Sequence, residues 1–197
     1  MRVIWGVTAL VMLAGCGPKY IETTAVAGLE KQSLEPVMLI PFTAQSHAAG
    51  ELRSAVVAEE AAGILTGRLH QKLLARKVKV LLWEGSGPVP DEVTAREIGR
   101  ERTAPVVLVA VVIAYTEREG SAGGIRRPAS VGFTLRLIRS EDGATLWTGR
   151  YHETQKALLD DLTTTGLFIN RHGRWLTAQE LAEDGLERIL AVSPWSR

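Results

Sequence analysis

The only cysteine of the chain, Cys16, stands where its thiol could be chemically modified. An apolar run, Val3–Leu13, precedes it, with the basic residue Arg2 in front of the run and the small residues Ala14 and Gly15 behind it. A basic residue, an apolar segment and small residues in this order are typical of an export signal with a cleavage site. The sequence therefore predicts an exported protein that is processed next to its single thiol.

The four residues Leu13-Ala14-Gly15-Cys16 resemble the lipobox of bacterial lipoproteins. In that family the cysteine carries a diacylglycerol on its sulfur, the signal is cut before it, and the new amino terminus usually receives a further acyl chain such as palmitate. The resemblance implies that residues 1–15 are a cleaved signal peptide and that Cys16 anchors the protein in a membrane. The alternative, an uncleaved membrane span, is disfavoured because the apolar run is shorter than the ~20 residues that a span needs.

The residue after the cysteine, Gly17, bears on which membrane holds the protein. An aspartate at this position favours retention in the inner membrane in enteric-type lipoprotein sorting. Its absence resembles sorting to the outer membrane, so we expect a lipid-anchored protein that faces the periplasm.

Charge gives no reason to expect a nucleic-acid partner. The chain has 23 lysines and arginines and 22 aspartates and glutamates, and the signal contains only one of these charges, that of Arg2. Residues 16–197 are therefore formally neutral before histidine is considered, which provides no overall attraction to a polyanion. A single cysteine also cannot form an internal disulfide, and acylation would remove it from the candidate nucleophiles.

Three other places in the sequence contain residue types used in metal binding or catalysis. His47 lies in an expected loop without a neighbouring ligand, and His172 could act with Asp160 or Asp161 only if the fold brings them together. The segment Gly85–Gly87 lacks the spacing of a phosphate-binding loop and of a Gly-x-Ser-x-Gly nucleophile turn. We therefore expect no metal, no cofactor beyond the acyl groups on Cys16, and no enzymatic activity.

The hydrophobic pattern predicts an α/β (α+β) fold. Apolar or alternating runs indicate about five strands, and helical spacing indicates three helices: strands at 37–42, 78–83, 106–115, 131–139 and 144–152, and helices at 52–76, 91–103 and from 177 onward. Helices join the first three strands, which favours parallel pairing, and the last two form a hairpin that completes a mixed sheet. Residues 16–35 are assigned to an acylated tether and residues 36–197 to a single α/β domain.

Several local expectations follow from the helical segments. Asp91 is expected to cap the second helix, with Val93 and Ile98 facing inward, and Thr177 with Glu180 matches a capping box for the last helix. In the first helix, two glycines four residues apart could let the helix sit close to the sheet. A helix-pairing face is the alternative interpretation of these glycines, Gly63 and Gly67.

The strand and helix order, together with the hairpin that runs from Arg139 to Trp147, resembles a family of envelope proteins. These are lipoproteins with the amino-terminal fold of TolB, including LpoB-type activators of penicillin-binding proteins and the curli-secretion lipoprotein. The resemblance covers roughly residues 35–192 and involves core and turn residues. It implies a small domain on a lipid anchor that binds other envelope proteins and has no active site.

Candidate partner contacts lie in a Gly- and Arg-rich loop, Thr116–Ala129, and at the carboxyl end of the chain. Arg126 and Arg127 are expected to meet an acidic surface, although a solvated connection is the simpler interpretation of this loop, and Trp195 is expected near an exposed tail. The main hypothesis is a non-enzymatic accessory component of an envelope assembly or secretion machine. The protein could also form homo-oligomers.

The alternative hypothesis is a periplasmic small-ligand-binding lipoprotein. Open parallel sheets bind ligands at the carboxyl ends of their strands. The site would then be lined by the segments Thr43–Gly50 and Gly85–Pro90, which follow two of the expected parallel strands.

Overall fold

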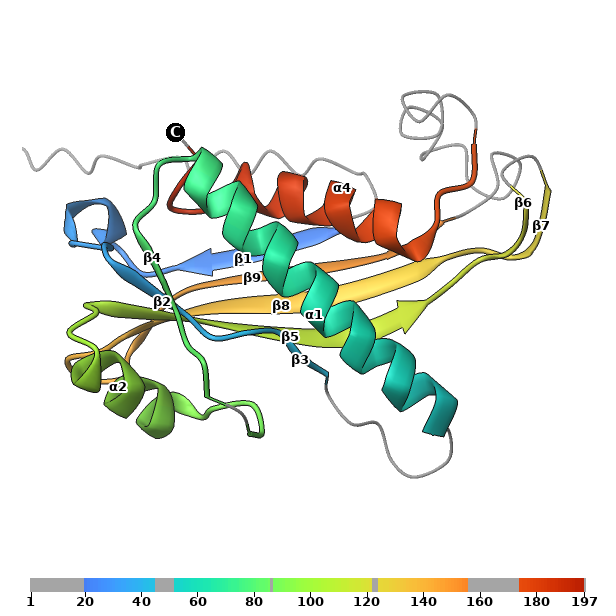
Figure 1. Cartoon of the computed structure of the whole chain (residues 1–197). Coiled ribbons are helices and arrows are strands. Elements are labelled where there is room, and N and C mark those ends of the chain that lie inside the picture. The colour runs from blue at the N-terminus through green and yellow to red at the C-terminus, as the bar shows by residue number, and fades with distance from the viewer. Residues whose placement is uncertain (1–19, 45–51, 86, 122–123, 156–173, 197) are drawn as a thin grey trace, which may run out of the picture.

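A computed structural model of the chain describes residues 20–44, 52–85, 87–121, 124–155 and 174–196 (Figure 1). Several residues singled out above lie outside this part of the chain: the expected signal peptide at residues 1–15, Cys16, Gly17, His47, Asp160, Asp161 and His172.

The described strands form a seven-stranded mixed sheet and a separate two-stranded ribbon. The order in the large sheet is β1-β9-β8-β5-β2-β4, with β3 also beside β5. The strands of the large sheet are β1 (Ile21–Ala25), β2 (Val37–Leu39), β3 (Thr43–Ala44), β4 (Val80–Leu82), β5 (Val106–Thr116), β8 (Ser130–Arg139) and β9 (Thr145–Thr154). Strands β4, β2 and β5 are parallel, whereas β5, β8, β9 and β1 pair antiparallel in succession. The predicted α/β class, parallel first half and terminal hairpin are confirmed.

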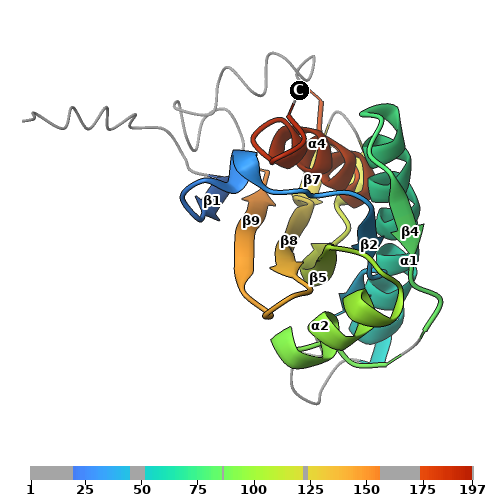
Figure 2. The same cartoon turned by 90° about the vertical axis from the view of Figure 1, so that its left-hand side faces the viewer.

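Helices cover the two faces of this sheet unequally. Helices α1 (Leu52–Ala75) and α4 (Ala178–Leu190) lie side by side on one face, and the shorter α2 (Glu92–Glu101) lies on the other (Figures 1 and 2). A 3-10 turn, η1 (Leu29–Lys31), precedes β2. The larger core therefore forms beneath α1 and α4, and a smaller one forms beneath α2.

The central strand β5 explains why both cores can form. Every residue from Val106 to Ala110 is at most 1% exposed, so alternate side chains enter the larger and the smaller core. On the α1–α4 side, Phe133 of β8 contacts Tyr151 of β9 with ring centroids 5.0 Å apart. The long apolar run that forms β5 is therefore a strand covered on both faces.

The predicted helix caps are confirmed, but one predicted core residue is wrong. The Asp91 carboxylate accepts a hydrogen bond from the Thr94 amide at 2.8 Å, and Thr177 and Glu180 form the reciprocal capping box. Ile98 is buried, whereas Val93 is 55% exposed. Val93 lies in the first turn of a short helix. The buried side of this helix carries Ala95 and Ile98, and the helical period places Val93 on the exposed side.

The expected tether at residues 16–35 is also corrected. Ile21–Ala25 form β1, which pairs with β9 in the register Ile21↔Tyr151 to Ala25↔Trp147. The polar sequence Ile-Glu-Thr-Thr-Ala does not alternate like a half-buried strand because β1 is an edge strand and is largely exposed. The sheet consequently begins well before residue 36, and the two-residue strand β3 brings the count above the expected five.

Candidate interaction surfaces

The predicted contact loop contains a two-stranded ribbon. Strands β6 (Glu119–Ser121) and β7 (Gly124–Arg127) pair antiparallel beyond the ends of β5 and β8. Arg126 and Arg127 are both exposed, and the Arg127 guanidinium lies 3.2 Å from the Glu119 carboxylate. This internal pairing offsets part of the charge expected to meet an acidic partner, so the contact role of the two arginines stays a prediction.

Trp195 is not on an exposed tail, and that prediction is wrong. Its side chain is only 7% exposed and packs with the core beneath α1 and α4. After α4 ends, the chain folds back, and the Ser193 hydroxyl accepts a hydrogen bond from the Trp195 amide at 3.2 Å. The large apolar area of an indole favours this return to the core, so Trp195 serves packing in this structure.

A different surface combines apolar side chains with unpaired backbone groups. We define the β4 edge surface as strand β4 with its two exposed leucines. Leu81 and Leu82 point to opposite faces of the strand and are 39% and 45% exposed, values high for leucine. Strand β4 pairs with β2 on one side and with no described strand on the other, so it ends the sheet.

The register of β4 identifies the backbone groups that point outward. The Val37 amide donates to the Lys79 carbonyl at 2.8 Å, and the Trp83 amide donates to the Leu39 carbonyl at 3.0 Å. Because inward and outward groups alternate along a strand, Val80 and Leu82 direct their N–H and C=O away from the sheet. Such an edge is a template for a further strand.

The two helix glycines lie on an exposed part of α1. A Cβ atom at Gly63 or Gly67 would meet no other described atom within 4 Å, so neither glycine is needed to bring the helix close to the sheet. That expectation is wrong. The neighbouring Ile64 is 38% exposed and adds a further apolar side chain to the outer surface of α1.

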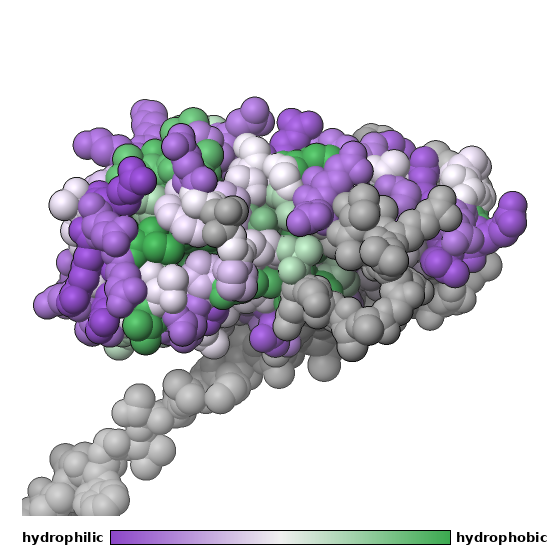
Figure 3. All heavy atoms as spheres, turned by 60° about the horizontal axis from the view of Figure 1, so that its bottom comes forward, coloured by the Kyte–Doolittle hydropathy of each residue, from purple (hydrophilic) through white to green (hydrophobic). Residues whose placement is uncertain are grey.

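The visible part of the sheet face beside α2 has a mixed surface. Seen from this side, hydrophobic residues form small areas separated by hydrophilic ones (Figure 3). Arg136 of β8 pairs with Glu92 at 2.5 Å, and Arg150 of β9 lies 3.9 Å from Glu22 of β1. The charges on this face are thus partly balanced within the molecule.

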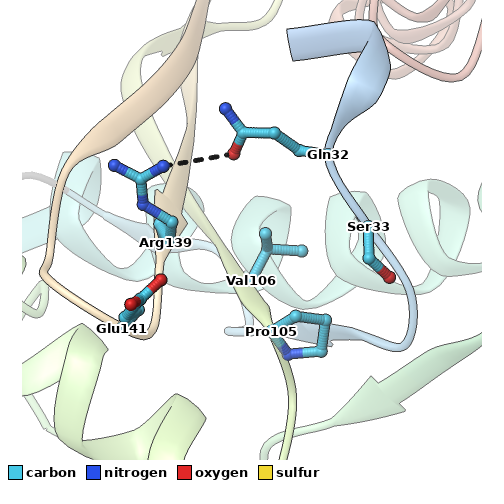
Figure 4. Close-up of a pocket in the computed structure, with 6 residues that line it drawn as sticks. All are labelled: Gln32, Ser33, Pro105, Val106, Arg139 and Glu141. Atoms are coloured by element: carbon cyan, nitrogen blue, oxygen red, sulfur yellow. Dashed lines mark hydrogen bonds between the residues drawn. The ribbon is translucent and has the colours of Figure 1, made fainter.

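An open depression of about 400 Å³ lies at the amino-terminal ends of β2 and β5 (Figure 4). Its lining residues are Gln32, Ser33, Pro105, Val106, Arg139 and Glu141. Arg139 reaches Gln32 at 3.4 Å but also donates two hydrogen bonds to Asp142, at 2.9 and 2.7 Å. The Arg139 guanidinium holds the pKa of Asp142 at about 2, so the arginine already has a carboxylate partner. The depression lies at the opposite strand ends from those expected for a ligand site.

A buried polar cluster joins α4 to the edge of the sheet. Glu153 is 3% exposed; its carboxylate accepts a hydrogen bond from the Tyr151 hydroxyl at 2.9 Å and pairs with Arg188 at 3.1 Å. Burial and the Glu153 carboxylate raise the pKa of the Tyr151 phenol, which keeps it a neutral donor. Arg188 also lies over the Tyr20 ring, 5.5 Å from its centroid. This cluster fastens the start of β1 to the body of the domain.

Among the described residues, no three side chains of histidine, cysteine, aspartate or glutamate gather in a way that could hold a metal ion. None of the described helices is long and apolar enough to cross a membrane.

Comparison with known proteins identifies the fold. No family model and no curated protein matches the chain. Among solved structures, a PelC dodecamer from Paraburkholderia phytofirmans is similar, with 17% identity over 89% of this chain and 96% of that chain and a TM-score of 0.55. Lipoprotein GNA1162 from Neisseria meningitidis matches with 12% identity over 68% and 91% of the two chains (TM-score 0.40), and the LpoB C-terminal domain from Salmonella enterica with 16% over 60% and 82% (TM-score 0.34).

The likeness to PelC extends over nearly the whole of both chains and shows a shared fold. LpoB, which the sequence resemblance named, is among the matches, although its TM-score is too low to support an argument of its own. The chain therefore has the α/β fold expected from its resemblance to envelope lipoproteins, and PelC is the solved structure that carries this conclusion.

Proposed function

We propose that this protein is a non-enzymatic lipoprotein, anchored through Cys16 in the outer membrane, that binds other proteins of the cell envelope from the periplasmic side. The lipobox-like sequence supports the anchor, and the resemblance to envelope lipoproteins without an active site supports an accessory rather than a catalytic role. The single observation that carries protein binding is the β4 edge surface, where exposed leucines stand beside an unpaired strand edge.

The β4 edge surface suits the addition of a strand from a partner. The outward N–H and C=O groups of Val80 and Leu82 would pair with the backbone of the partner, as in other cases of strand addition. Covering the exposed part of each leucine would contribute up to about 1 kcal/mol, roughly half the value of full burial. Backbone pairing would thus set the position of the partner, and the leucines would add affinity.

A second copy of the chain is one partner of this kind. PelC, which shares the fold, is found as a dodecamer, and this supports self-association of the present chain as part of its function. The machine in which such an assembly would act is a cell-envelope assembly or secretion system, in keeping with the lipid anchor.

The proposal is tested by changing the β4 edge surface in the acylated, full-length protein. Leu82→Glu places a charge on an exposed side chain and should disrupt partner docking without emptying a core position. Crosslinking in intact envelopes followed by mass spectrometry should then lose the dominant partner, whether another protein or a second copy. Val93→Glu, on the exposed side of α2, is the matched control and should retain it.

Two outcomes would count against this function. Equal partner recovery from Leu82→Glu and the unchanged protein would exclude the β4 edge surface as the docking site. Absence of acyl groups on Cys16 by mass spectrometry would remove the anchor.

The alternative, small-ligand binding, has the Gln32–Arg139 depression as its supporting observation. A ligand there should raise the melting temperature of the protein, and Arg139→Gln should abolish that rise. A panel of envelope metabolites that leaves the melting temperature unchanged would favour protein binding.

A further inference from the structure

We infer that the domain stands on the membrane with its β1 edge against the phospholipid headgroups and its β4 edge surface turned toward the periplasm. This inference rests on the proposed acylation of Cys16. It adds which part of the molecule meets the lipid surface and which part remains available to a partner.

The chain between the proposed anchor and the fold is short. Cys16 is followed by three residues, and Tyr20 is already joined to the sheet, because the His152 amide donates to the Tyr20 carbonyl at 3.0 Å. Four residue steps span at most about 14 Å when the chain is fully extended. The start of β1 therefore cannot lie farther than this from an anchor at Cys16.

Strand β1 is held in the sheet by several contacts, so its separation from β9 does not readily lengthen the tether. Its five residues pair with β9, and Arg188 lies over the Tyr20 ring while pairing with the buried Glu153 carboxylate. The amino-terminal end of β1 is thus held by both the backbone ladder and the side chains of α4 and β9. Tension on the anchor is transmitted to this edge of the sheet.

The open edge of β1 carries outward backbone groups and mostly polar side chains. Tyr20 and Val26 bond to β9 at either end of the strand, so the intervening Ile21, Thr23 and Ala25 direct their backbone groups outward. The outer four residues of β1, Glu22–Ala25, are all exposed and include no large apolar side chain. The threonine hydroxyls and the outward backbone groups can hydrogen-bond to headgroups, and Arg150, 3.9 Å from the Glu22 carboxylate, offsets the charge of that residue.

Strands β1 and β4 lie at opposite edges of the sheet. Strands β9, β8, β5 and β2 separate β1 from β4, giving five spacings of about 4.8 Å, or roughly 24 Å in all. With β1 at the headgroups, the exposed leucines of β4 lie on the far side of the domain. The membrane then also prevents unwanted pairing of the open β1 edge, which proteins commonly protect in some way.

Headgroup proximity is measured in the full-length acylated protein in vesicles of phosphatidylethanolamine and phosphatidylglycerol. Thr23→Cys and Leu82→Cys each supply one thiol for a fluorophore on an exposed side chain at opposite edges of the sheet, because acylation occupies the sulfur of Cys16. Lipids with a nitroxide on the headgroup should quench the label at position 23 several-fold more strongly than the label at position 82. Adding a flexible Gly-Ser segment after Lys19 should remove most of this difference.

The possible results separate this inference from the proposed function. Equal quenching at the two positions in protein whose Cys16 is acylated would overturn the orientation and leave the anchor intact. A label at position 23 that is protected from both lipid and soluble quenchers would also overturn it, because a protein would then cover β1. If Cys16 carries no acyl groups, the proposed function itself fails.

Discussion

At the scale of single residues, the buried ion pair between Glu153 and Arg188 is expected to contribute more to stability than the exposed ion pairs of the surface. The Glu153 carboxylate is 3% exposed and has both Tyr151 and Arg188 as partners, whereas the Glu187 carboxylate, paired with Lys72 and Arg76 at 2.7 and 2.6 Å, is 54% exposed. Removing the partner of a buried polar group costs far more folding free energy than removing the partner of an exposed one. The two glutamates therefore differ in their expected contribution to stability.

Glu153→Gln should lower the free energy of unfolding by about 1–3 kcal/mol, because Arg188 and Tyr151 lose a charged acceptor. Glu187→Gln, a matched change in a neighbouring exposed pair, should cost less than about 1 kcal/mol. Urea unfolding followed by circular dichroism measures both values. Equal losses in the two variants would show that the buried cluster has no special weight.

At the scale of elements, the β8–β9 hairpin is set by its turn. Gly143 has φ +81°, a region that favours glycine, and the Asp142 carboxylate accepts from both Arg139 and the Ala144 amide. The Asp142–Gly143 turn was predictable from the sequence because these residue types have strong local preferences. The hairpin is thus a place where local chemistry and the tertiary fold agree.

The Asp142 carboxylate also predicts a dependence of stability on pH. Arg139 first, and the Ala144 amide second, lower the pKa of Asp142 from 3.8 to about 2. A lowered pKa in the folded state contributes stability that is present above the unfolded value and is lost as pH falls toward 2. The difference in unfolding free energy between the protein and Asp142→Asn should therefore be constant at neutral pH and shrink between about pH 4 and pH 2. A difference that stays the same over this interval would exclude the linkage.

The elements that the sequence did not predict share a physical cause. The buried strand β5 and the capped helix α4 carry strong apolar and capping signals, and both were found as expected. β1 was missed because an exposed edge strand needs no apolar alternation, and its pairing with β9 is decided by tertiary contact. The β4 edge surface was missed because the apolar residues of Val78–Trp83 predict a strand but not its place in the sheet. Only the sheet order shows that β4 lies at the edge.

At the scale of the whole molecule, the domain begins only a few residues after the proposed anchor at Cys16. A chain that begins at residue 36 would lack β1 and leave the outer edge of β9 unpaired. Such a chain should unfold at lower urea concentration than one that begins at residue 20 and should associate more readily through the uncovered edge. Denaturant titration and light scattering would show this, and equal stability of the two chains would mean that β1 is dispensable.

The pairing of Ile21 with Tyr151 joins segments that are far apart in the sequence. Bringing such distant segments together costs more loop-closure entropy than forming the β8–β9 hairpin, whose partners are close in sequence. We therefore expect the hairpin and the helices to fold first and β1 to add last. Until then the amino-terminal end remains outside the sheet, so the proposed signal cleavage and acylation would act on a segment that is still unpaired.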